Sequence, residues 1–205
     1  MKKDDGKIGF VIPIMIFMLL MVFVAFTWRM KIISSAKIQV EDAITDANLA
    51  AAVVDTDLYG SAYRIENYNY TDMYNKYLRT LKASLDLDDT LTPRTSTYLA
   101  SAVKIEDFWV YNVVKNEEGE ITRVILHKVY DNGIATNIDT TYTSDFDEIR
   151  TPDGSRVESL TIYSNISFDV DLIAGYKVNV SKDESVDVVS NGIEITESPS
   201  TAAAP

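Results

Sequence analysis

A run of twenty-one uncharged residues, Ile8 to Trp28, begins only seven residues into the chain. Thirteen of these residues are Leu, Ile, Phe or Val. A helix that crosses the roughly 30 Å hydrocarbon core of a bilayer needs about 20 apolar residues, and thirteen such side chains favour insertion by about 4 to 8 kcal/mol. The run therefore predicts a transmembrane helix over residues 8–28, preceded by a cytoplasmic leader of residues 1–7.

A cleaved secretory signal peptide is the alternative interpretation of this run. The apolar region of a signal peptide has about 7–15 residues and ends at a small-x-small cleavage site. Here the run is longer and passes through Thr27 and Trp28 into Arg29, without such a site. The sequence therefore favours a helix that stays in the protein as a single-pass span, with membrane lipid around it.

The orientation of the span is less directly encoded. Lys and Arg residues flank both of its ends in nearly equal number, so the positive-inside rule gives no clear preference. The remainder of the chain is acidic and rich in Tyr and Thr, which favours export. We therefore expect a cell-membrane protein with a cytoplasmic N-terminus and an extracellular C-terminal domain.

Charge and cysteine content exclude several classes of function. Of the 31 acidic residues 29 follow Trp28, against 16 of the 19 basic residues, which gives this part a net charge of about −13. Such a surface repels phosphate, so we expect no nucleic-acid partner and no electrostatic attachment to anionic lipid. The chain has no cysteine, which excludes disulfides, thiolate metal sites and cysteine nucleophiles.

The segment after the span, residues 29–59, predicts an amphipathic continuation of the same helix. It lacks Pro and Gly and is rich in Ala, which favours helix, and Gly60 is a typical stop. Apolar residues recur at alternating intervals of three and four, the pattern of a heptad seam. This stripe, the candidate assembly face, consists of Ile33, Ala36, Val40, Ala43, Ala47, Ala50 and Val54. It can pack on the chain's own C-terminal domain or on related subunits, and the sequence leaves both open.

The rest of the chain predicts an extracytoplasmic α+β domain over residues 60–190. Helical spacing of apolar residues predicts a short second helix, and alternating β-branched and aromatic residues predict two long hairpins. The expected fold is a long N-terminal helix, a short helix and an antiparallel sheet of four to five strands, which the long helix covers. The expected elements are a helix over 71–85, strands over 103–114, 121–130, 157–173 and 176–189, a polar loop over 134–156 and a disordered tail over 191–205.

Residues with chemical potential are few. His127 is the only histidine and lies in a strand pattern, so we expect it to be structural. Two acidic clusters, Asp86 to Asp89 and Asp145 to Asp153, supply oxygen ligands of the kind that calcium binds, but neither matches the twelve-residue calcium loop. Six tyrosines between residues 59 and 77 either form a binding face or cover the junction of helix and sheet. Phosphate-loop, HExxH and GxSxG motifs do not occur, so we expect no enzyme and no cofactor.

A short basic leader, a glycine, an apolar helix and an Ala-rich amphipathic continuation, followed by a sheet, resemble type IV pilin-like subunits. The stretch Asp42-Ala-Ile-Thr-Asp-Ala-Asn-Leu-Ala-Ala-Ala is similar to TadE-like pseudopilins of tight-adherence pili. The resemblance covers residues 1–58. It implies a pilin-like component of a pilus or secretion apparatus, whose partners are other pilin-like subunits or assembly-platform proteins.

The same resemblance implies removal of the leader by a prepilin peptidase. Gly6 and Gly9 are the candidate processing sites, which would leave Lys7 or Phe10 at the new N-terminus. Members of this family carry Glu at the fifth position after cleavage, where this chain has an apolar residue, Val11 or Ile14. The resemblance therefore implies a minor subunit. The alternative is a single-pass anchored β domain that acts alone as a binding or sensory module.

Overall fold

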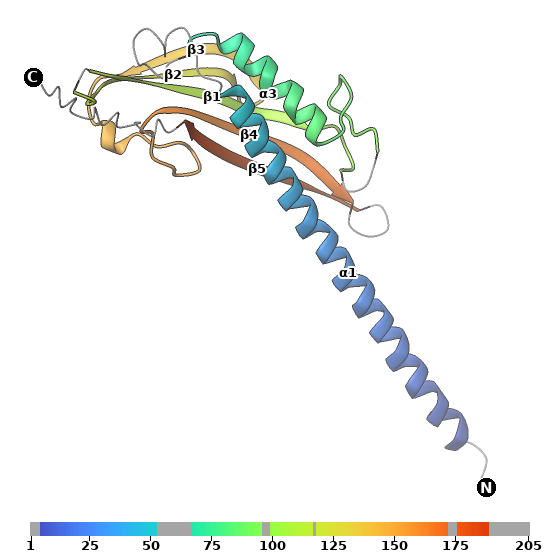
Figure 1. Ribbon diagram of the computed structural model, residues 1–205. Helices are drawn as coiled ribbons and strands as arrows, with labels where there is room; N and C mark the ends of the chain where they lie inside the picture. Colours follow the sequence, from blue (N-terminus) through green and yellow to red (C-terminus); the bar gives the residue numbers. More distant parts are fainter. Residues whose placement is uncertain (1–4, 53–66, 96–98, 117, 172–175, 189–205) are drawn as a thin grey trace, which may run out of the picture.

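The computed structural model describes residues 5–52, 67–95, 99–116, 118–171 and 176–188. These residues form one long helix whose upper end lies on a five-stranded sheet, with a second helix beside it on the same face (Figure 1). The α+β class and the order of elements predicted from the sequence are confirmed. The predicted disordered tail lies outside the described residues.

Helix α1, Asp5–Ala51, is continuous from the apolar run into the Ala-rich segment. Its 47 residues span about 70 Å at 1.5 Å per residue. Pro13 lies within the helix near its N-terminal end, and Ala-rich sequence without Pro or Gly carries the helix from Arg29 onward. The predicted continuation to residue 59 and the stop at Gly60 fall on residues 53–66, outside the described part.

Helix α3, Tyr70–Ser84, matches the second predicted helix. The side chain of Asn69 caps its N-terminus by accepting a hydrogen bond from the Asp72 backbone N–H at 3.2 Å. Met73, Tyr77 and Leu81 recur at helical spacing and are fully buried. This apolar row lies against α1 and the sheet, which is the arrangement that the spacing predicts.

The sheet has the order β3-β2-β1-β4-β5, and each neighbouring pair of strands is antiparallel. The hairpin of β1 and β2 and the hairpin of β4 and β5 are the two predicted from alternation. A turn at Asn132-Gly133, where both residues have positive φ, joins β2 to β3. The strands are β1 Lys104–Lys115, β2 Ile121–Asp131, β3 Ile134–Tyr142, β4 Leu160–Asp171 and β5 Lys177–Val188.

The prediction of a polar loop over 134–156 is wrong for its first nine residues, which form β3. This strand lies at the edge of the sheet, and most of its side chains are exposed. Apolar alternation arises only where one face of a strand is buried, so this edge strand shows none. The antiparallel ladder to β2 and the β-propensity of its Thr and Ile residues hold it instead. A short 3-10 helix, η1 Phe146–Glu148, follows.

The core has two parts, one on each face of the sheet. The main core lies between the sheet and the two helices and includes Ile44 of α1, Tyr77 of α3 and Phe108 of β1. A smaller cluster uses the alternate residues of β1, Tyr111 and Val113, and is covered by the segment that contains η1. The sequence predicted the helical cover of one face but not this second cluster.

Candidate functional site

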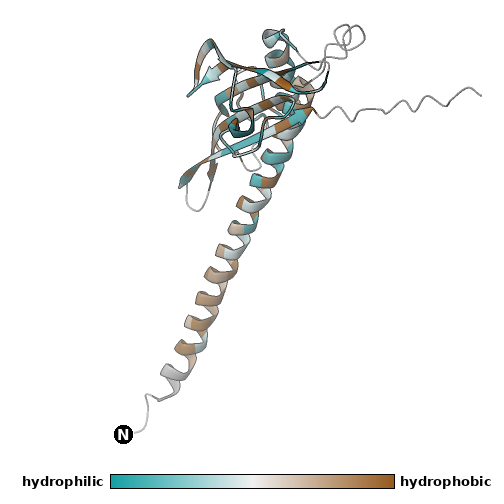
Figure 2. Cartoon of the chain, turned by 90° about the vertical axis from the view of Figure 1, so that its left-hand side faces the viewer, coloured by the Kyte–Doolittle hydropathy of each residue, from teal (hydrophilic) through white to brown (hydrophobic). Residues whose placement is uncertain are grey.

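The lower part of α1 is apolar and exposed on every side. Its large apolar side chains from Phe10 to Met30 are between 41% and 73% exposed, and Figure 2 shows that hydrophobic residues predominate along this part of the helix. A soluble protein rarely leaves so large a continuous apolar surface in water. The helix is long and apolar enough to cross a membrane, as a single-pass membrane protein requires.

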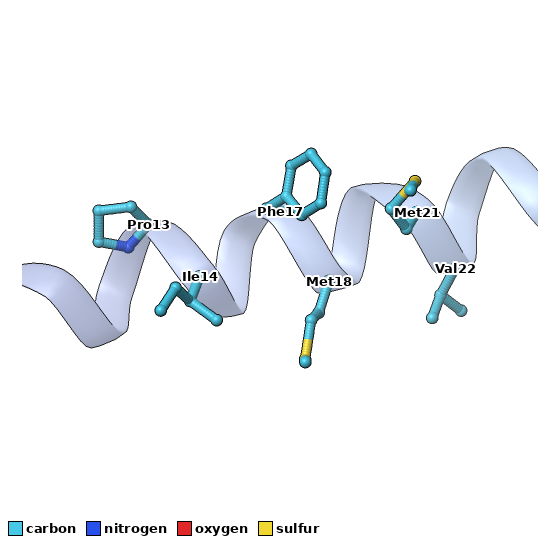
Figure 3. A pocket seen from close by; sticks show the side chains of 6 residues that line it. All are labelled: Pro13, Ile14, Phe17, Met18, Met21 and Val22. Carbon is cyan, nitrogen blue, oxygen red and sulfur yellow. The ribbon is translucent and has the colours of Figure 1, made fainter.

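The exposed segment carries ridges of side chains rather than a smooth surface. Pro13, Phe17 and Met21 form one row at intervals of four residues, and a second row runs beside it (Figure 3). Between the rows lies a shallow apolar groove. Such grooves between i±4 rows accept the side-chain ridge of another helix. The second row consists of Ile14, Met18 and Val22.

The only hydroxyl in this segment is satisfied within the helix. Thr27 donates its Oγ–H to backbone carbonyls one turn earlier, at 3.0 Å from the oxygen of Phe23 and 2.9 Å from that of Val24. A hydroxyl bonded in this way costs little in lipid. Gly6 and Gly9, the candidate processing sites, lie in the first turns of α1, and their cleavage stays a prediction.

The candidate assembly face lies mostly in the protein's own core. Ala36, Val40, Ala43 and Ala47 are at most 3% exposed, and the last three belong to the main core between α1, α3 and the sheet. Ile33 is partly buried against the same core, Ala50 is half-buried, and Val54 lies outside the described residues. Of the two partners that the sequence left open, the structure places the chain's own domain on this stripe between residues 33 and 51.

A buried polar contact ties α1 to the sheet. Asn48 is fully buried, its Nδ2 donates to the backbone carbonyl of Glu184 at 2.9 Å, and its Oδ1 accepts from Ser164 Oγ at 2.8 Å. The sequence analysis missed this group. Its signal was available, because Asn48 follows Ile44 by four residues and so interrupts the apolar side of the helix with an amide.

We expect Asn48→Ala to destabilise the folded domain by about 1–3 kcal/mol, because it leaves the buried Ser164 hydroxyl and the partly buried Glu184 carbonyl without this partner. Urea unfolding of the full chain in detergent, followed by circular dichroism, measures this change. Gln39→Ala is the matched control, since Gln39 is an exposed amide on the same helix. Equal stability of the two variants would contradict the role assigned to Asn48.

An ion pair and a partly buried carboxyl lie beside this contact. Lys182 Nζ lies 3.1 Å from Glu41 Oε2. Burial raises the pKa of the neighbouring Glu184 above its usual range, while Lys182 opposes the shift and the negative charge of Glu41 adds to it. A carboxyl with a raised pKa in the folded state destabilises the fold when it is ionised.

This shift predicts a pH-dependent effect of Glu184→Gln. Above the folded-state pKa the wild-type carboxyl is ionised and costs stability, so the permanently neutral amide should make the protein more stable at pH 7. Below the ordinary pKa of glutamate the carboxyl is protonated in both states, so the advantage should disappear near pH 4. Urea unfolding at both pH values measures it, with the exposed Glu118→Gln as control. A variant less stable than wild type at pH 7 would contradict the sign.

The two acidic clusters are used in local structure. Asp88 caps a turn by accepting from the backbone N–H groups of Thr90 and Thr92, and the Thr90 hydroxyl also donates to it, which lowers the pKa of Asp88. In the second cluster Asp147 pairs with Arg156. Within the described ranges no group of three or more acidic or histidine side chains is arranged to hold a metal ion, so calcium binding gains no support from the geometry.

His127 and the tyrosines lie where α3 meets the sheet. The His127 ring stacks on Tyr70 with a centroid distance of 3.7 Å, and its Nδ1 is 2.6 Å from Asp139 Oδ1. Tyr74 and Tyr77 pack against Phe108 at 5.2 and 4.8 Å. These rings fill the junction between helix and sheet, one of the two roles predicted for them. Tyr68 is exposed, and the first two tyrosines, Tyr59 and Tyr63, lie outside the described residues.

Comparison with known proteins finds no family model that matches this chain, and no similar curated protein or solved structure.

Proposed function

We propose that this protein is a non-enzymatic, membrane-anchored component of a pilus or secretion apparatus, a minor pilin-like subunit. The observation that supports the proposal best is the division of one continuous helix. Its lower part, Phe10 to Met30, is apolar and exposed, and its upper part, Ala36 to Ala51, is built into the core of the domain. A helix built in this way couples the position of the domain to whatever its lower part binds.

The lower part is where assembly with related helices would take place. The upper stripe is occupied by the chain's own sheet, so the proposed partners, pilin-like subunits or assembly-platform proteins, must contact residues 10–32. The ridges of Figure 3 supply packing without a polar group. In lipid, helix association depends on close van der Waals packing rather than on the hydrophobic effect, so the fit of these ridges to a partner is what would give specificity.

The missing acidic residue supports a minor role. A carboxylate within the membrane pairs with a charged group, which in a pilin-like filament would belong to a neighbouring subunit. Val11 and Ile14 carry no carboxylate, so this chain cannot form that pair. A subunit present in every layer of a regular filament would lack that contact at each step. A subunit present once, at a tip or in an assembly platform, is held by its neighbours' contacts and tolerates the loss.

The second candidate is an anchored domain that acts alone as a binding or sensory module. One observation favours it. The edge strand β3 presents Ile134 and Ile138, which are 65% and 52% exposed, and an exposed strand edge is a surface on which an extended partner segment can pair. In this account the helix serves only as a tether.

The intact mass of protein extracted from membranes tests the pilin-like proposal. Loss of residues 1–6 or 1–9 is the expected result, because prepilin processing cleaves after Gly6 or Gly9. As a control, Gly6→Ala and Gly9→Ala introduced together should leave the leader in place. A wild-type chain that keeps its leader in cells with a prepilin peptidase would favour the lone anchored module instead.

A further inference from the structure

The folded domain begins almost directly above the apolar segment, without a stalk. Ile33 already packs against the main core, while Trp28, at the end of the apolar run, is 68% exposed. Ile33 follows Trp28 by five residues, which is a rise of only about 7.5 Å along the helix. The headgroup layer on each side of the hydrocarbon core is about 5–7 Å thick. The lower edge of the domain therefore lies at the level of the headgroups of any membrane that α1 spans.

The described ends of β4 and β5, Asp171 and Lys177, lie at this edge. In Figures 1 and 2 the described ends of β4 and β5 extend further along α1 toward its N-terminus than the rest of the sheet. The ion pair between Lys182 and Glu41 fixes the register. From Lys182 to Tyr176 is about 20 Å of strand, and from Glu41 down to Trp28 is about 20 Å of helix. Tyr176 therefore approaches the level of Trp28, with the difference set by the tilt between strand and helix.

Apolar side chains become steadily more exposed along this end of the hairpin. Val178 and Val180 alternate onto the side of β5 that packs on the main core, and Tyr176 comes directly before the strand. Val180 packs against the core, Val178 is 43% exposed and Tyr176 is 76% exposed. The neighbouring Lys177 is turned aside, since its Nζ donates to the Ala100 carbonyl at 2.9 Å. The contacts within the described part of the chain do not account for this exposed apolar row.

We infer that Tyr176 and Val178 rest on the lipid interface of the same membrane that α1 spans, as a second contact between the domain and the bilayer. The inference rests on the proposed anchoring of α1. Tyrosine suits this depth, because its ring favours the acyl boundary and its hydroxyl favours the headgroups. The exposed Asp171 at the same end of the hairpin keeps insertion shallow and offsets the charge of the exposed Lys177, so apolar burial rather than charge carries the contact.

This contact would limit how far the domain tilts on top of α1. A single helix leaves a domain free to rotate in the plane of the membrane and to tilt. A second point of contact on one side of the helix removes the tilt toward and away from that side. The helix surface away from the hairpin then remains open to a partner helix.

The absence of native cysteine makes a direct test possible. Single cysteines at Tyr176, Leu19 and Glu118 are labelled with an environment-sensitive nitrobenzoxadiazole dye. Each full-length variant is reconstituted in phosphatidylcholine vesicles, with or without brominated acyl chains. Tyr176 is exposed, so its replacement should not unfold the domain. Leu19 reports on the span, and the exposed Glu118 lies at the β1–β2 turn, at the opposite end of the sheet.

The inference predicts that brominated lipid quenches the dye at 176 and at 19 but leaves the dye at 118 bright, and that the emission at 176 is shifted to the blue relative to 118. Replacing part of the lipid with phosphatidylglycerol should not strengthen the quenching. The inference is overturned if the dye at 176 is as unquenched by brominated lipid as the dye at 118 and emits at the same wavelength. In that case quenching at 19 shows that the anchor still stands, and its absence shows that the anchoring fails as well.

Discussion

Replacing Ile44 with alanine is expected to destabilise the folded domain by about 2–5 kcal/mol, because the side chain is fully buried where α1 meets the sheet. The cost includes the lost burial of the removed carbons and the cavity that remains. Because small domains are stable by only about 5–15 kcal/mol, this loss is a large share of the total. Urea unfolding of the full chain in detergent measures it.

The same helix supplies a matched control for this change. Ile38 is 56% exposed and lies less than two turns from Ile44, so Ile38→Ala removes the same atoms from the same element. We expect it to change stability by less than about 0.5 kcal/mol. If the two variants lost stability equally, the packing of the upper helix into the core would be refuted.

Placing two arginines in the lower helix, at Phe17 and Leu20, is expected to prevent membrane integration. Each arginine near the centre of a span costs about 2.5–3.5 kcal/mol. Together they offset most or all of the roughly 4–8 kcal/mol that the apolar residues supply. Alkaline extraction of membranes, followed by detection of the protein in pellet and supernatant, measures the result.

The control for this pair changes exposed apolar residues of the domain in the same way. Ile134→Arg and Ile138→Arg add the same charges on the edge strand β3, at 65% and 52% exposed positions. This variant should stay in the membrane pellet. Extraction of both double variants, or of neither, would contradict the assignment of residues 8–28 as the span.

The sequence predicted those elements whose one face is buried. The period of the apolar residues located α1, α3 and four strands, because burial on one face creates that period. The strand β3 was missed because most of its side chains are exposed at the edge, so no apolar alternation marks it. A turn signal at Asn132-Gly133 was visible, but it does not say whether a strand follows.

The sequence predicted the apolar stripe of the candidate site but not the element that covers it. The stripe from Ile33 to Ala47 shows that one side of the helix is apolar, but periodicity does not say what covers that side. Tertiary packing decided in favour of the chain's own sheet. The contact of Asn48 with Ser164 joins residues 116 positions apart, and nothing local in the sequence pairs them. The apolar helix depends only on local composition, so sequence and structure agree on a segment long and apolar enough to cross a membrane.

The most direct test of the proposed function is crosslinking in living cells from a photoreactive residue at Leu19, which is 73% exposed on the lower helix. A pilin-like subunit predicts defined adducts with a second membrane protein or a second copy, while the same residue at Glu118 gives none of them. A chain that integrates into the membrane but gives no protein adduct at position 19 would contradict helix-mediated assembly and leave the anchored module as the function.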